Sequence, residues 1–509
     1  MGIFEKIAKK KDVVSNSTNG FYFGSSEAEA ENIIGLCLIN YFDDYLMVLN
    51  QLKAGRFIFT GRKGVGKSAI AKYIHDSSEE TDDSFSKIIR VNDVDIENII
   101  QANDTDILNF SLIFEWLILV NAIKLIVKNN CTKYTKEYDK LKKFLDINAG
   151  IVNVDEYQFV EGNKYKGGEV KITALKHIFE GVLKKYFDVK VDKAPFYKLI
   201  PPLKDILKII LDYEANKTFE FWLLFDDLDI NYNVNNQKDR NKIMELIRIS
   251  KIYNNEVFRN NQAKILLFLR EDICDSIIPY FPDSSKIFSS YEINLNWYSQ
   301  YLYTTGNECE IALKKLANKR IELNFLRHKI QFSGDPWDFL FNTTCVPYYG
   351  KSVFKYILDF TFYRPRDIIT FLSTMSNEDY QYPIDRETLK LMLKKYISKT
   401  VNEIKNELSL YFSESDINKI FSDIFPELSN NQYTTISSFK ILLDKYSLSI
   451  DSDNAFKHLV DYSLLAYKDN YDNIFVNYRD KNAFEKLNKE YTYITLHKCI
   501  YHFYKNISN

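Results

Sequence analysis

Glycine and proline are scarce in this chain of 509 residues, which contains 16 Gly and 10 Pro. Glycine makes up about 3% of the chain, against a usual share of roughly 7%. This scarcity excludes collagen-like and linker-rich proteins. The hydrophobic share of 46% and the charged share of 27% are ordinary globular values, so a largely disordered chain is excluded as well. At roughly 150 residues per domain, the length indicates two to four domains.

Cysteines are also few and widely spaced, because the chain has 6 and no two of them form a CxxC pair. This spacing argues against a zinc ribbon and against a disulfide framework. A reducing compartment fits such a chain best. The first residues, Met1 to Lys6, lack the apolar core of a signal peptide. We therefore expect a cytoplasmic protein.

No excess of one charge marks the chain as a whole, since 67 basic residues face 69 acidic ones. The complete chain therefore lacks the electrostatic footprint of a nucleic-acid-binding protein. Its most apolar run, residues 110–127, carries Glu115, Asn121 and Lys124. These polar residues favour a buried helix over a membrane span, and we expect no membrane partner.

Apolar strand-like runs alternate with helical patterns between residues 56 and 297. This alternation predicts a parallel α/β sheet. The predicted strands are residues 56–60, 87–91, 219–225, 265–269 and 291–295. Residues 104–215 are mostly helical and long for a connection between two strands, so we interpret them as a helical insertion in this core.

The remaining chain is predicted to be mainly helical. The predicted domains outside the core are an N-terminal helical segment at 1–55 that begins with 25 loose polar residues, a helical lid at 298–394 and a winged-helix-like domain at 395–509. The last domain is inferred from helices, two short strand-like runs at 464–467 and 473–477, and a terminal helix.

The scarce glycines gather in one octapeptide, Gly61-Arg62-Lys63-Gly64-Val65-Gly66-Lys67-Ser68. It matches the phosphate-binding loop pattern G-x-x-x-x-G-K-[ST] in full, between an apolar strand and an amphipathic helix. Glycines let successive backbone N–H groups face the phosphates, and the helix that follows adds the positive end of its dipole. The residues predicted to hold the nucleotide are Gly61, Arg62, Lys63, Gly64, Val65, Gly66, Lys67, Ser68 and Ala69. Lys67 is expected to reach the β- and γ-phosphates and to serve catalysis, and Ser68 to ligate Mg²⁺.

A second motif, residues 221–229, is an apolar strand that ends in acidic residues, which is the Walker B pattern. Asp226 is predicted to hold the Mg²⁺ shell, and Asp227 to polarise the attacking water. Many ATPases of this division place Glu where Asp227 stands, one methylene longer, so the strength of hydrolysis stays open. Asp229 is the reserve candidate for the base.

Arginines at two further positions are candidates for contacting the nucleotide. Arg270 ends the fourth predicted strand, where a γ-phosphate sensor commonly lies, or it is a strand-end arginine paired with Glu271 or Asp272. Arg364 and Arg366 flank Pro365 at a predicted helix start in the lid. The alternative for this pair is a surface helix start with salt bridges.

Lys286 is a further candidate, as a finger residue that acts across a subunit boundary. It lies just before the fifth predicted strand. The alternative is a solvated loop lysine.

Taken together, these motifs resemble those of bacterial AAA+/STAND-like P-loop ATPases of the ASCE division. The resemblance is nearest to a poorly characterised group that opens with a segment like residues 22–29, and origin-recognition-type ATPases are more distant. It implies an ASCE sheet, a helical lid and a winged-helix tail. Relatives of this kind often act as nucleotide-driven switches, many of them in bacterial antiviral defence.

Three functions remain open on the sequence. The first is an ATP-hydrolysing switch, using ATP and Mg²⁺, that couples nucleotide state to a homo-oligomer or a partner effector protein. No N-K-x-D motif for guanine is present, so adenine is expected. The second is an ATP-dependent nucleic-acid-binding protein, although the net charge is −3 over residues 401–509 and +7 over 121–210. The third is a nonhydrolytic scaffold in which bound nucleotide holds the lid closed.

Overall fold

The computed structural model describes most of the chain. The described residues are 17–25, 38–90, 110–128, 135–148, 169–171, 175, 181–186, 193–213, 217–229, 232–234, 236–258, 263–305, 307–342, 351–376, 378–431, 434–468, 474–476, 478 and 493–505. Two compact units divide it: one is Glu27–Asn296, and the other joins Trp297–Asn509 to the N-terminal residues up to Ser26.

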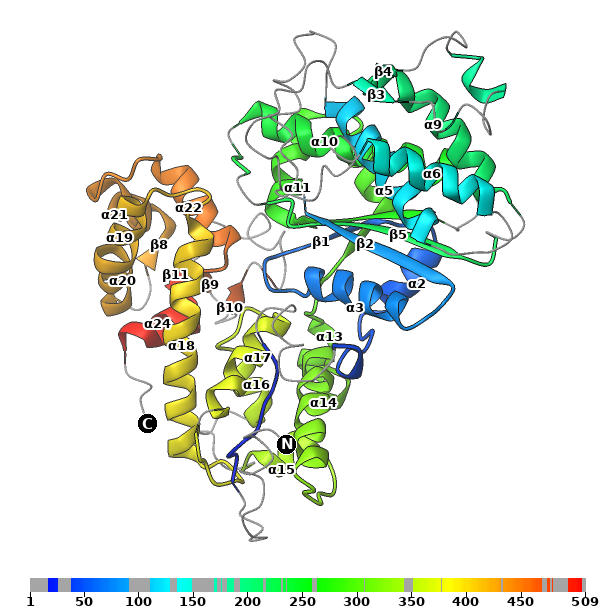
Figure 1. Cartoon of the computed structure of the whole chain (residues 1–509). Coiled ribbons are helices and arrows are strands. Elements are labelled where there is room, and N and C mark those ends of the chain that lie inside the picture. Colours follow the sequence, from blue (N-terminus) through cyan, green and yellow to red (C-terminus); the bar gives the residue numbers. More distant parts are fainter. Residues whose placement is uncertain are drawn as a thin grey trace. The chain divides into compact units, whose positions relative to one another are not determined.

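A parallel five-stranded sheet forms the centre of the first unit (Figure 1). Its strand order is β2-β5-β6-β1-β7, and all four neighbouring pairs are parallel. The strands are β1 (Ile58–Gly61), β2 (Ser84–Arg90), β5 (Glu220–Asp226), β6 (Ala263–Arg270) and β7 (Glu292–Asn294). The five predicted strands are therefore confirmed, and the unit is an α/β fold with the order that the ASCE resemblance implies, in which β6 separates β1 from β5.

The register of this sheet brings the ends of its strands together. Gly61 at the end of β1 pairs with Arg270 at the end of β6, and Arg90 at the end of β2 pairs with Asp226 at the end of β5. Because ligands of open α/β sheets bind beyond the carboxyl ends of the strands, this edge is where a site is expected.

Helices cover both faces of the sheet, with α3 on one face and α10 on the other (Figure 1). Both helices are amphipathic, and their apolar residues, such as Ile70 of α3 and Ile247 of α10, are buried. The helices of this core are α2 (Val48–Lys53), α3 (Lys67–Glu79), α10 (Gln237–Ile252), α11 (Glu271–Ile277) and α12 (Ser284–Tyr291). Short turns of 3-10 or π-helix lie at Leu38–Asn40, Tyr253–Val257 and Ile278–Tyr280.

The described part of the predicted insertion is mainly helical. It contains α5 (Phe110–Lys128), α6 (Thr135–Ile147), α9 (Phe196–Leu211) and a small antiparallel pair, β3 (Glu169–Lys171) with β4 (Lys193–Pro195). By length and composition alone α5 could cross a membrane, but 67% of its apolar window is buried inside the protein. It packs against α9, α10 and the sheet, as expected for a core helix.

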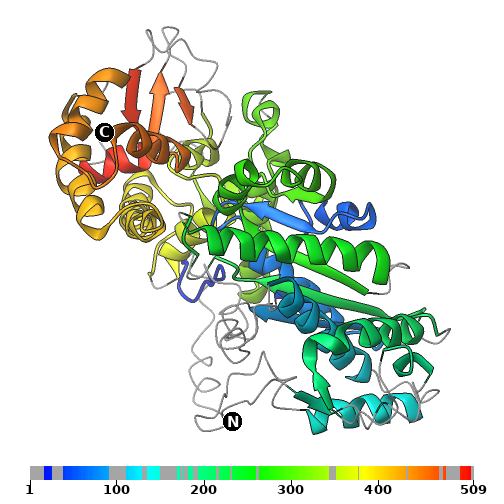
Figure 2. The same cartoon turned by 90° about the horizontal axis from the view of Figure 1, so that it is seen from above.

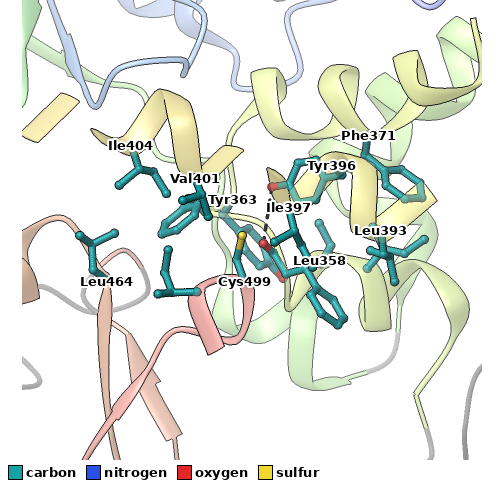
Figure 3. Packing of buried hydrophobic residues seen from close by; sticks show 14 of the residues in the cluster. Leu358, Tyr363, Phe371, Leu393, Tyr396, Ile397, Val401, Ile404, Leu464 and Cys499 are labelled. Atoms are coloured by element: carbon teal, nitrogen blue, oxygen red, sulfur yellow. Dashed lines mark hydrogen bonds between the residues drawn. The ribbon is translucent and has the colours of Figure 1, made fainter. Parts of the chain in front are cut away.

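The second unit is built around one long helix, α18 (Arg386–Leu408). Its buried face, which includes Tyr396 and Val401, packs between residues of other elements such as Phe371 and Cys499 (Figure 3). The preceding helices are α13 (Gln300–Thr305), α14 (Ala312–Arg327), α15 (Pro336–Leu340), α16 (Val353–Leu358) and α17 (Pro365–Leu372), with 3-10 turns at Glu308–Glu310 and Ser373–Met375.

The last part of this unit combines helices with a small antiparallel sheet (Figure 2). Its elements are α19 (Glu414–Lys419), a π-turn (Ile420–Ile424), α20 (Phe425–Asn431), β8 (Thr434–Thr435), α21 (Ile436–Lys445), α22 (Ser452–Asp461), β9 (Leu465–Lys468), β10 (Ile474–Val476), β11 (Tyr493–Leu496) and α24 (Lys498–Tyr504). The predicted hairpin is β9 with β10, and the predicted terminal helix is α24. The sequence missed β8 and β11, which complete the order β10-β9-β11-β8. β8 has only 2 residues, and β11 is defined by its pairing with β8 and β9.

The prediction of a separate N-terminal segment that begins with loose polar residues is wrong for residues 17–25. They are extended and belong to the second unit, where Ser17 bridges to Gln381. Phe21 and Phe23 are buried, and Asn324 of α14 accepts a hydrogen bond from the Tyr22 amide at 2.7 Å. The two buried rings and these backbone contacts hold the segment in place, whereas its polar composition predicted a loose segment. The first 16 residues lie outside the described part.

Candidate nucleotide site

The phosphate-binding loop connects β1 to α3, as the motif requires. Gly64 and Gly66 have φ values of 84° and 100°, which residues other than glycine adopt at a cost. Gly66 is also the N-cap of α3, so the loop turns its backbone directly into the helix N-terminus. Four backbone N–H groups of a helix N-terminus have no partner within the helix, which suits them to an anion.

Lys67 lies with its ammonium group against the loop itself. Its Nζ donates to the carbonyl oxygens of Gly61 at 3.0 Å and Arg62 at 3.1 Å. Burial lowers the pKa of Lys67, and the charge of Arg270 lowers it further, whereas Asp229 and Asp226 act in the opposite direction. The ammonium group therefore stands among the polar residues at the strand ends, in position to turn toward a phosphate.

Ser68 and Asp226 come together as the sequence predicted for a metal site. Ser68 and Asp226 line the same cavity, and the Ser68 side chain favours the charged form of the Asp226 carboxylate, although the two residues belong to separate motifs. Burial, followed by the charge of Asp227, raises the pKa of Asp226 to about 6. A buried carboxylate whose charge is disfavoured in this way is suited to a cation.

The donor set also fits Mg²⁺ in particular. Among the described residues, no group of three or more His, Cys, Asp or Glu side chains is placed to hold a metal ion. Mg²⁺ typically takes one or two carboxylates and completes its octahedron with phosphate oxygens and water. One hydroxyl and one carboxylate are therefore an adequate protein contribution.

Asp227, the predicted base, is held by a residue that the sequence did not single out. Arg90 at the end of β2 donates from Nε to the Asp227 carboxylate at 3.1 Å. Asp227 has a φ of 54°, a left-handed conformation that turns the chain sharply at the end of β5. The signal that could have found Arg90 is its place as the last residue of the strand beside β5, which requires the strand order.

Arg270 meets two carboxylates beside the loop. It donates to Asp229 at 3.1 Å and to Asp272 at 3.0 and 2.5 Å. The ion pair with Asp272 was one of the two alternatives, and the contact with Asp229 places Arg270 next to Lys67, whose pKa it affects. Its position is that of a sensor, and its action on a phosphate stays a prediction.

The other predicted loop residues take different environments. Val65 is buried, and a Cβ on Gly61 would lie 2.8 Å from its Cγ2, so the Val65 side chain packs under the loop. Arg62, Lys63 and Ala69 are half-buried. Their contacts with phosphate stay predictions.

Arg364 is a correction to the sequence analysis. Its side chain is 1% exposed and forms ion pairs with Asp367 at 2.9 Å and Glu407 at 3.0 Å. Two carboxylates satisfy this guanidinium in the interior of the second unit, so it serves the packing of that unit rather than nucleotide binding. The predicted helix start at Pro365 is confirmed.

Arg366 and Lys286 keep their predicted roles as open hypotheses. Arg366 is half-buried in the first turn of α17, and its charge acts on Glu403. Lys286 is exposed on α12, in the unit that carries the phosphate-binding loop.

Comparison with known proteins gives one family match to part of the chain. Residues 312–405, from α14 into α18, match the family described as the FunZ-associated C-terminal helical domain. A stretch of 173 residues is 26% identical to a putative transposon gamma-delta 80.3 kDa protein of Escherichia coli K12, covering 33% of this chain. The chain aligns with 21% of that relative's length.

Among solved structures, similar chains include an ORC2 protein of Aeropyrum pernix and a Walker-type ATPase of Pyrococcus abyssi. The first is 12% identical with a TM-score of 0.35, covering 89% of this chain and 87% of its own. The second is 9% identical with a TM-score of 0.38, covering 91% and 95%. Likenesses this distant carry no argument, and the assignment of an α/β P-loop NTPase fold depends on the sheet order and the loop geometry.

Proposed function

We propose that this protein binds and hydrolyses ATP with Mg²⁺ and uses the nucleotide state as a switch. The observation that carries the proposal is the meeting of Ser68 and Asp226 beside Lys67 at the carboxyl edge of the sheet. These residues come from two motifs that are far apart in the sequence. Ser68 and Asp226 would hold a Mg²⁺ ion there, and the chemistry it would supply is neutralisation of the phosphate charge.

The chain's own residues supply the remaining chemistry. The loop amides and Lys67 bind and orient the phosphates, and Arg270 stabilises the charge that develops on the γ-phosphate. Asp227 accepts a hydrogen bond from the attacking water and orients it. Its ion pair with Arg90 holds the shorter side chain at a defined position, which supports hydrolysis over a purely nonhydrolytic scaffold.

Two substitutions test this function. Lys67→Ala removes the cation that faces the phosphates, so ATP binding is expected to be abolished. Asp227→Asn keeps the shape of the side chain but not its basicity, so binding is expected to persist while turnover is lost. Nucleotide binding by titration calorimetry and phosphate release are the measurements, with a contaminating ATPase excluded by purifying both variants identically. Phosphate release that is unchanged in both variants would refute the proposal.

The biological role that we propose is coupling of this switch to a homo-oligomer or a partner effector protein in the cytoplasm, in bacterial antiviral defence. The support is the resemblance of the motifs to AAA+/STAND-like ATPases. A second, mostly helical unit with a dense core accompanies the ATPase core, as expected for a lid and tail that respond to nucleotide. The measurement is survival of phage infection by cells that carry the gene with its genomic neighbours, compared with the Lys67→Ala variant.

A second candidate is an ATP-dependent nucleic-acid-binding protein. The observation that favours it is the helices α21 and α22 followed by the antiparallel strands β9, β10 and β11, an order typical of winged-helix DNA-binding modules. The net charge of −3 over residues 401–509 opposes it. Gel shifts at low salt with and without ATP decide, and the absence of a shift with DNA and RNA would remove this candidate.

A further inference from the structure

A cavity of about 520 Å³ opens between α3, β2 and α5 in the ATPase core. Its volume lies within the range of roughly 300–1,000 Å³ that small-molecule sites occupy. Ser68 and Asp226 belong to its lining, so it adjoins the metal end of the nucleotide site. β2 is the last strand of the sheet on this side, so the cavity lies at the sheet edge and not under the phosphate-binding loop.

The cavity is strongly basic. Its described lining residues include one carboxylate, Asp226, and five cationic side chains, which are Lys72, Lys87, Arg90, Lys124 and Lys128. The spacing of the helical residues explains their convergence, because residues four apart lie on the same helix face. Lys72 follows Ser68 by four positions on α3, and Lys128 follows Lys124 by four positions on α5.

Carboxylates outside the lining hold three of these cations. Lys72 pairs with Asp76 at 3.0 Å, Lys128 with Glu79 at 2.8 Å, and Arg90 with Asp227 at 3.1 Å. The Lys128 and Glu79 side chains are 55% and 50% exposed, and an exposed pair contributes only about 0–1 kcal/mol, whereas those of Lys72 and Asp76 are 15% and 18% exposed. The pairs orient Lys72 and Lys128, and a phosphate group can bind these two cations in place of their carboxylates, since charge-assisted hydrogen bonds to phosphate are strong.

The uncharged lining distinguishes between classes of anionic ligand. It includes Ile88, Leu125 and His75, whose pKa burial lowers and whose Nδ1 lies 2.7 Å from the Ser86 hydroxyl. Among the residues that the structure describes, the lining has no Phe, Tyr or Trp, the residues on which proteins stack the bases of single-stranded nucleic acids. A lysine-rich cavity of this size with a small apolar wall suits a compact ligand instead.

We propose that this cavity binds a small molecule with two or more phosphate groups, at a site separate from the nucleotide in the phosphate-binding loop. Lys72, Lys124 and Lys128 hold its phosphates, and Ile88 with Leu125 contacts the rest of the molecule. The proposal does not depend on ATP hydrolysis, because the five residues that it uses all lie outside the phosphate-binding loop.

The test uses inorganic tripolyphosphate as the probe in the full-length Lys67→Ala variant, where binding at the loop is removed. Titration calorimetry without Mg²⁺ measures its affinity, and Lys72→Ala/Lys124→Ala is added to this background. The matched control is Lys142→Ala/Lys143→Ala, which removes the same charge from exposed positions of α6. We expect the cavity variant to bind the probe roughly tenfold or more weakly, or about 1.4 kcal/mol, and the control to change the affinity less than about twofold.

Three results would overturn the proposal. The first is that tripolyphosphate does not bind to the Lys67→Ala protein. The second is that the cavity and control variants weaken tripolyphosphate binding equally. The third is that the protein binds single-stranded DNA and not tripolyphosphate, and that the cavity variant loses this DNA binding. Thermal unfolding and ATP binding of Lys72→Ala/Lys124→Ala with Lys67 intact show that the variant is folded. The same ATP titration separates failure of this cavity from failure of the ATPase function.

Discussion

Gly66 and Gly55 have similar left-handed conformations, with φ values of 100° and 85°, and neither has an atom within 4 Å of the place where a Cβ would stand. Replacing either residue with alanine therefore adds conformational strain without a clash. Only Gly66 belongs to the phosphate-binding loop, while Gly55 lies between α2 and β1. The two positions form a matched pair.

We expect Gly66→Ala and Gly55→Ala each to destabilise the fold by about 1–2 kcal/mol. Gly66→Ala is also expected to weaken ATP binding roughly tenfold or more, because relief of the strain turns the loop amides away from the phosphates. Chemical denaturation and nucleotide titration are the measurements. Equal affinities in the two variants would show that the conformation of Gly66 is irrelevant to binding.

Asp226 is a residue where function and stability oppose each other. Its pKa rises from 3.8 to about 6 in the folded protein, so the folded state binds this proton more tightly than the unfolded chain. Between about pH 4 and pH 6 the free energy of unfolding therefore falls as the pH rises. At pH 7 the folded protein carries the full cost of the buried charge.

We expect Asp226→Asn without nucleotide to be more stable than the natural protein at pH 7.5 by roughly 1–3 kcal/mol. The difference is expected to shrink at pH 5, where the carboxyl group is mostly protonated. Denaturation at both pH values measures it, and hydrolysis should be lost at both. A variant less stable than the natural protein at pH 7.5 would contradict the effect of burial on this carboxylate.

At the scale of elements, the buried group of Arg364, Asp367 and Glu407 joins the start of α17 to α18. Arg364 was predicted to contact the nucleotide because it lies at a helix start in the helical segment after the sheet, with a surface helix start with salt bridges as the alternative. Its burial depends on Glu407, 43 positions away, and no local pattern reports such a partner.

We expect Arg364→Ala to destabilise the second unit by about 3–5 kcal/mol, because it leaves two buried carboxylates without their cation. The control is Lys390→Ala on α18, the helix that carries Glu407, and it breaks a pair with Glu387 at 3.0 Å whose acid is 76% exposed. It is expected to cost less than about 0.5 kcal/mol. Thermal unfolding of both variants measures this, and equal effects would mean that the buried group contributes nothing special.

The elements of the ATPase core were largely predictable, and those of the tail were less so. Five apolar strands with helices between them form a strong periodic signal, and the sheet confirms each of them. The short strands β8 and β11 bury only a few residues each and are held by pairing with β9 and with each other. Such strands form because they pair with neighbouring strands, and the sequence of the strand alone does not predict them.

At the scale of the whole molecule, the proposed homo-oligomer leads to a testable prediction about how its active sites are composed. If Lys286 acts on the nucleotide of a neighbouring subunit, each site is built from two chains. Lys286→Ala and Asp227→Asn would then each abolish hydrolysis while leaving ATP binding intact. Mixed in equal amounts, they are expected to recover activity, since some sites combine Asp227 of one subunit with Lys286 of another.

Phosphate release from the mixture and particle mass measure this prediction. With ATP, Asp227→Asn is expected to form particles whose mass is a multiple of 60.0 kDa. The particle mass of Lys67→Ala is expected to be the same with and without ATP. A mass that ATP does not change, together with no recovery in the mixture, would exclude a finger acting between subunits. It would leave a partner protein as the receiver of the switch.

From sequence alone, the chain predicts where a nucleotide would bind, because the loop motif is contiguous and its chemistry depends on backbone shape and adjacent side chains. The Walker B acid and the five strands follow from the same local logic. Tertiary structure decided which partners the charged residues have. Arg90 holds Asp227 from 137 positions away, and Arg364 is buried in an ion pair with Glu407. The cations of the basic cavity come from three elements. Coulomb interactions depend on distance in space, and only the folded chain sets those distances.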